Sequence, residues 1–104
     1  MCGIVGFTGH RQAAPVLLDG LSKLEYRGYD SAGLAVQQPG GTAMIVKAKG
    51  RLKVLADKTE QGATMPGTCG VGHTRWATHG EPSELNAHPH DSDDGLVVGV
   101  HNGI

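Results

Sequence analysis

Short apolar runs separated by glycine and proline recur along the chain and predict a domain that mixes strands and helices. Residues 2–8 are apolar and rich in glycine, and Gly9 follows them, which predicts a buried strand ending in a turn. Residues 69–74 predict a second buried strand, whose glycines leave room for close contacts. Residues 96–101 predict a third. We expect these strands to form the centre of the fold.

Two segments have the three- and four-residue spacing of amphipathic helices. The first begins at Gln12 and ends near Tyr26. Its apolar positions are Ala14, Leu17, Leu18, Leu21 and Leu24. The second covers residues 51–58, with Leu52 and Leu55 on one side and charged residues on the other. We expect the first helix to cover one face of a sheet.

A hairpin is expected between these helices. Residues 33–38 and 42–48 are β-prone, and the turn signal Pro39-Gly40-Gly41 joins them. Polar segments predict one loop at residues 26–31, before the hairpin, and another at residues 61–68, after the second helix.

Composition narrows the classes of partner. The chain has 104 residues, 17 glycines and a formal net charge of -1, without a run of Lys or Arg, so neither nucleic acid nor an anionic membrane is an expected partner. A small polar substrate fits better. The two cysteines make no disulfide framework, no signal peptide precedes Cys2, and no apolar run reaches membrane-spanning length, so we expect a cytoplasmic protein. Cys69 is expected in the core.

Cys2 directly follows the initiator methionine and is the main candidate nucleophile. If Met1 is removed, Cys2 carries both a thiol and a free α-amine. Because the amine titrates near ~8 and a thiol near ~8.5, the amine can accept the thiol proton at neutral pH. The alternative is an ordinary buried cysteine in the first strand.

Histidines gather in the second half of the chain, and five of the six lie between His73 and His101. This bias raises a metal site as a rival interpretation. The spacing disfavours it, because His88 and His90 flank a proline and no Cys-x-x-Cys motif is present, so no metal or cofactor is expected. Most of these histidines fall in a long polar segment, residues 75–90, and a loop of that length is usually functional.

Five motifs in order resemble the glutaminase domain of the class II (N-terminal nucleophile) amidotransferases. They are residues 2–6 (CGIVG), 26–33 (YRGYDSAG), 73–80 (HTRWATHG), 86–89 (NAHP) and 101–103 (HNG). The second and third are similar to those of the glucosamine-6-phosphate synthase branch of that family. The resemblance implies an α+β fold, a four-layer α/β/β/α sandwich of antiparallel sheets. Residues 1–104 would be an incomplete amidotransferase domain, and the sugar-phosphate isomerase domain would lie outside them.

The resemblance also implies roles for the reacting groups. Cys2 would attack the side-chain amide of L-glutamine, giving a γ-glutamyl thioester and ammonia. Asn102 and the backbone amide of Gly103 match the oxyanion hole, and such donors suit developing negative charge. Arg75 matches the residue that grips the substrate carboxylate, where a guanidinium can bond both oxygens.

Further residues match positions around the substrate. Trp76, Thr78 and His79 match a loop that closes over glutamine. Arg27 and His88 match residues that shape the site; on their own, Arg27 could cap the preceding helix and His88 could be an exposed loop residue.

Two functions of different classes follow. In the first, the chain hydrolyses glutamine and supplies ammonia to fructose-6-phosphate, held by the isomerase domain of a full-length homodimer; the 104 residues alone would be inactive. In the second, the chain is a non-catalytic fragment or a module whose histidine-rich loop binds a metal or a partner.

Overall fold

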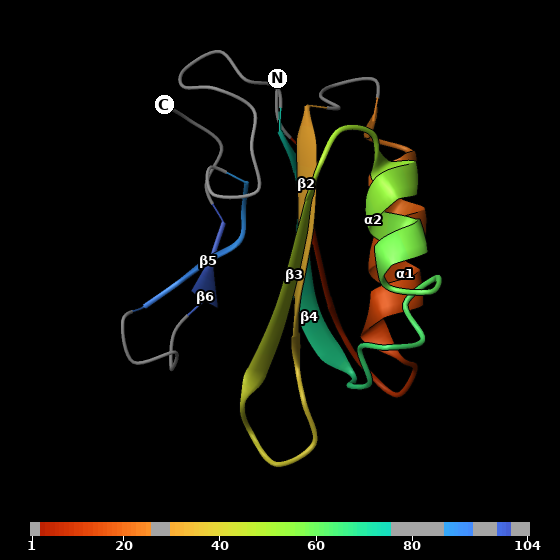
Figure 1. Ribbon diagram of the computed structural model, residues 1–104. Helices are drawn as coiled ribbons and strands as arrows, with labels where there is room; N and C mark the ends of the chain where they lie inside the picture. The colour runs from red at the N-terminus through yellow and green to blue at the C-terminus, as the bar shows by residue number, and fades with distance from the viewer. Residues whose placement is uncertain (1–2, 26–29, 76–86, 93–97, 101–104) are drawn as a thin grey trace.

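The computed structural model describes residues 3–25, 30–75, 87–92 and 98–100, and these residues form three layers. Two helices lie against one face of a four-stranded sheet, and a small two-stranded sheet lies against the other face (Figure 1). Antiparallel sheets packed with helices in this way confirm the mixed α/β class predicted from the sequence. In the described part of the chain, no helix is long and apolar enough to span a membrane.

The main sheet is antiparallel throughout and has the order β1-β4-β2-β3. Its strands are β1 (Gly3–Thr8), β2 (Ser31–Gln37), β3 (Ala43–Lys49) and β4 (Cys69–Arg75). The expected hairpin is present as β2 and β3, but β4 inserts between β1 and β2. The two strands at the centre of the sheet are therefore β4 and β2.

Helices α1 (Ala13–Ser22) and α2 (Leu52–Lys58) confirm the two predicted helices. The buried side of α1 packs on β4, where two glycines make room for it: a Cβ at Gly70 would lie 3.1 Å from Leu17, and one at Gly72 would lie 2.9 Å from Leu21. The start of α2 is held by Glu25, whose carboxylate accepts a hydrogen bond from the Leu52 N–H at 2.9 Å. The core lies between these helices and the sheet.

The other face of the main sheet carries strands β5 (His90–Asp91) and β6 (Val98–Gly99), which pair antiparallel. Residues 75–90 were expected to form a loop, yet their last residue, His90, begins β5. Ser31, expected in a loop, is the first residue of β2, because β4 and β3 both pair with it.

Two of the strands predicted as buried are only partly so. Among the described strands, β1 lies at the edge of the main sheet with β4 as its one neighbour, and Ile4 is 40% exposed. The described part of the last predicted strand, residues 98–100, is half-buried or exposed. Apolar composition predicted both strands but could not show that each lies at an edge or in a thin second sheet.

Cys69 is exposed, so its placement in the core was wrong. Gly70 and Gly72 face α1, and side chains alternate along a strand, so Cys69 points to the opposite face. At that end of the sheet, Cys69 lines an open groove of about 320 Å³ with Val71 and Val98. Because its side chain is exposed, Cys69 contributes little to the stability of the core.

Replacing Cys69 with serine should therefore change the free energy of unfolding by no more than ~0.5 kcal/mol, the usual range for surface sites. A core position would lose more, because a buried hydroxyl without a partner costs ~1–3 kcal/mol. Labelling the native protein with a thiol reagent, followed by peptide mapping, gives a direct check. Protection of Cys69 until the protein unfolds would contradict its exposed position.

Candidate functional site

One end of the main sheet gathers the described neighbours of the predicted site residues. Gly3, which follows Cys2 in the sequence, pairs with Thr74. Arg75, the last residue of β4, pairs with Ser31 at the start of β2. The first residues of β1 and β2 and the last residue of β4 thus lie side by side, because neighbouring antiparallel strands begin and end at the same edge.

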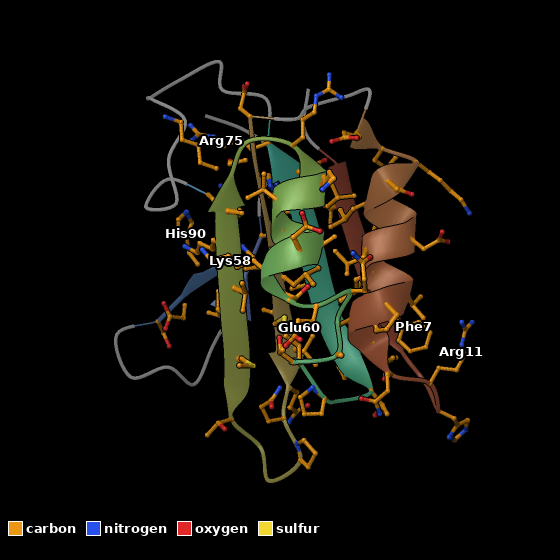
Figure 2. The ribbon with its side chains drawn as sticks, turned by 45° about the vertical axis from the view of Figure 1, so that its right-hand side comes forward. Phe7, Arg11, Lys58, Glu60, Arg75 and His90 are labelled. Atoms are coloured by element: carbon orange, nitrogen blue, oxygen red, sulfur yellow. The ribbon has the colours of Figure 1, made fainter. Side chains whose placement is uncertain are left out.

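Backbone hydrogen bonds fix the position of Arg75 at this edge. The Arg75 carbonyl accepts a hydrogen bond from the Asp30 N–H at 2.9 Å, and the Asp30 carbonyl accepts one from the Gly50 N–H at 2.8 Å. Arg75 is half-buried and lies at the end of the sheet, far from Arg11 (Figure 2). A guanidinium anchored at a strand end, with part of its surface open, can bind a carboxylate.

Strand β6 runs toward the same edge. Val98 lines the groove beside Val71. The next residue, Gly99, pairs with His90. The His90 ring contacts Lys47, which lies nearer the site end of the sheet. Asn102 and Gly103 follow two and three residues after Val100 in the sequence. The direction of β6 is therefore compatible with their predicted role.

His88 is not an exposed loop residue. Its ring is half-buried and stacks on that of His73, with ring centroids 4.3 Å apart and an interplanar angle of 26°. His73 is fully buried in β4. The centroid of the His88 ring is also 4.5 Å from that of the His90 ring, and these two rings are tilted by 57°.

Burial and neighbouring positive charge favour the neutral form of His88 and His90. Burial lowers the pKa of His88 from 6.5 to about 4, with smaller contributions from His73, His90, Arg75 and Lys47. Burial and Lys47 likewise lower the pKa of His90. The pKa of Lys47 is itself lowered by burial, which Asp91 opposes. Because Arg75 acts on His88, these two predicted site residues lie close together.

Of the predicted site residues, the structure describes Arg75 and His88. The other seven lie outside the described residues: Cys2, Arg27, Trp76, Thr78, His79, Asn102 and Gly103. Their roles stay predictions.

Sequence reasoning missed His73, Lys47 and His90 as neighbours of the site. One signal was available, because His73 and Arg75 are two residues apart in a strand and must share a face. Among the described residues, no group of three His, Cys, Asp or Glu side chains is placed to hold a metal ion. The His73 and His88 rings stack face to face, whereas metal ligands converge through ring nitrogens.

Comparison with known proteins connects this arrangement to a family. Over all 104 residues, the chain is 62% identical to a glutamine–fructose-6-phosphate aminotransferase (isomerizing) of Caldanaerobacter subterraneus. It is 57% identical to that of Clostridium acetobutylicum and 56% identical to that of Thermus thermophilus. The chain is homologous to one segment of these aminotransferases. It spans 17% of the length of each of these glutamine–fructose-6-phosphate aminotransferases.

The fold of this chain is also that of a solved amidotransferase. The glutamine phosphoribosylpyrophosphate amidotransferase of B. subtilis, complexed with ADP and GMP, superposes with a TM-score of 0.73 and 25% sequence identity. The match covers 90% of this chain and 20% of that one. No protein-family profile matches the chain. The amidotransferase fold expected from the five motifs is confirmed, and the described residues build three of its four layers.

Proposed function

We propose that this chain forms part of a glutamine-hydrolysing site that releases ammonia for the amination of fructose-6-phosphate. The observation that carries the proposal is identity of up to 62% along the entire chain to enzymes of that name. The gathering of Gly3, Ser31 and Arg75 at one sheet edge supports it.

The chemistry needs a nucleophile, a base and donors for an oxyanion. The Cys2 sulfur attacks the amide carbon of glutamine, and the α-amine takes the thiol proton and delivers it to the departing nitrogen, which leaves as ammonia. Water, deprotonated by the same amine, then attacks the thioester and releases glutamate. Asn102 and the Gly103 amide stabilise the negative oxygen of each tetrahedral intermediate.

The other predicted residues bind and enclose the substrate. Arg75 holds the glutamine carboxylate, and Trp76, Thr78 and His79 enclose it. We further propose that the ammonia reaches fructose-6-phosphate in a separate isomerase domain, and that the complete enzyme is a cytoplasmic homodimer.

A chimera gives the direct test. Residues 1–104 would replace the matching segment of the Caldanaerobacter relative, and glutamate release from L-glutamine would be measured. Turnover close to that of the unmodified relative supports the proposal. A folded chimera without glutaminase activity would contradict it and favour a non-catalytic role.

Arg75→Lys in this chimera should lower kcat/KM for glutamine by roughly tenfold or more, because an ammonium cannot form the two parallel hydrogen bonds of a guanidinium. Because lysine keeps the positive charge, a fall in kcat/KM would show that the shape of the guanidinium is needed. Steady-state kinetics with glutamine give the measurement, and Arg11→Lys, at the far end of the molecule (Figure 2), is the matched control. Unchanged kcat/KM in Arg75→Lys would reassign Arg75 to a structural role.

A further inference from the structure

Residues 87–91 cross the main sheet in direct backbone contact with β2. A Cβ atom built on Gly33 would overlap the carbonyl oxygen of His88 and lie 2.9 Å from the ring of Pro89. Gly33 pairs with His73 on one side and Lys47 on the other. The segment therefore lies over the glycine with a histidine and a lysine on either side of it.

Three imidazole rings contact one another where this segment crosses the sheet, one pair stacked and the other tilted. His73 comes from β4 and is fully buried, His88 stacks on it at 4.3 Å, and His90 follows at 4.5 Å. The Nδ1 atom of His88 is buried and has no hydrogen-bond partner within the described ranges. The position of the His88 ring thus depends on the stack.

The charges around the stack favour neutral rings. The Lys47 ammonium lies 3.2 Å from Nδ1 of His90, and because an ammonium can only donate, this contact requires that Nδ1 be unprotonated. Lys47 of β3 and Arg75 of β4 both act on these rings, whereas Asp91 of β5 is the negative charge that opposes them. Two protonated rings about 4 Å apart would repel each other.

We propose that His73 is a positioning residue of the candidate site, which fastens residues 87–91, and with them the β5–β6 sheet, to the main sheet while the His88 ring is neutral. His73 acts through His88. The docking itself does not depend on the proposed glutaminase activity; its catalytic consequence rests on that proposal. β4 carries Arg75 two residues beyond His73, so the stack lies beside a predicted site residue.

Acid should release the segment. The pKa of His88 in the folded protein is below 6.5, so the docked state binds fewer protons than the open state. Docking is therefore complete above about pH 6.5 and weakens as the pH falls toward about 4. The experiment is amide hydrogen exchange on the chimera, corrected for the intrinsic pH dependence of exchange, with α1 as internal reference.

In the unsubstituted chimera, protection of the amides in residues 87–91 should fall at least roughly tenfold between pH 7 and pH 4.5, while α1 stays protected. His73→Phe keeps a ring for stacking and removes a group that lowers the pKa of His88, so its pH dependence should be weaker. His73→Ala should leave the segment poorly protected already at pH 7 and lower kcat/KM for glutamine. The exposed His10→Phe is the matched control and should behave as the unsubstituted protein.

Protection of residues 87–91 that does not change with pH in the unsubstituted chimera would overturn the proposal, and so would an undiminished pH dependence in His73→Phe. If His73→Ala does not fold, the pH dependence of exchange in the unsubstituted chimera and in His73→Phe still tests the proposal. Loss of glutaminase activity in the chimera itself, together with the expected exchange pattern, would contradict the proposed function and leave the positioning role of His73 standing.

Discussion

Glutamine hydrolysis by the chimera is expected to fall at least ~10⁴-fold when Cys2 is replaced by alanine, because loss of a catalytic nucleophile leaves only the contribution of binding and of the oxyanion donors. Glutamate release is the assay, run long enough to measure the residual rate. The matched control is Cys69→Ser, which changes the other cysteine at an exposed position and should leave kcat/KM within about twofold.

Retention of Met1 should have nearly the same effect as loss of the thiol. An acylated nitrogen at Cys2 cannot accept a proton, so the thiol would lose its base. The variant with Met1 retained must be verified by intact mass before the assay. Full activity in a protein that carries Met1, or in Cys2→Ala, would disprove the N-terminal mechanism.

The sequence predicted the elements well where periodicity and turn chemistry agree. The leucines of α1 keep one spacing along the helix, and four of the five apolar positions expected there are buried, with Leu24 just beyond the helix end and only half-buried. The hairpin was clear because Gly40 and Gly41 both adopt positive φ, which glycine permits.

The order of the strands could not be predicted in the same way. β4 pairs with β1 and β2 across more than thirty residues of sequence, and no local pattern encodes such a partner. The error at Cys69 has the same origin, because which face of β4 is covered depends on where α1 packs.

The candidate site was predictable as a set of motifs and not as a set of contacts. Arg75 was singled out for its chemistry, and the structure adds that the edge of the sheet holds its backbone. His73 was part of a recognised motif but had no assigned role. Its role depends on a long-range contact, because the ring of His73 meets that of His88 only once residues 87–91 fold back over β2. Neither periodicity nor composition predicts such a contact.

Gly33→Ala is expected to destabilise the domain by about 3 kcal/mol, the upper part of the range for overpacking in a tight site. The new methyl group would overlap a backbone carbonyl, that of His88, and a backbone cannot turn away as the end of a flexible side chain can. For a domain of roughly 100 residues, a loss of that order lowers the melting temperature by roughly 12 °C or more. Thermal unfolding of the chimera gives the measurement.

Gly6→Ala is the matched control, because Gly6 lies on the same face of the sheet and a Cβ there meets no atom within 4 Å in the described structure. It should change stability by no more than ~0.5 kcal/mol. Hydrogen exchange distinguishes the cause: Gly33→Ala should expose the amides of residues 87–91 before those of α1, because the clash pushes that segment off the sheet. Equal effects of the two substitutions would show that residues 87–91 do not lie directly against Gly33.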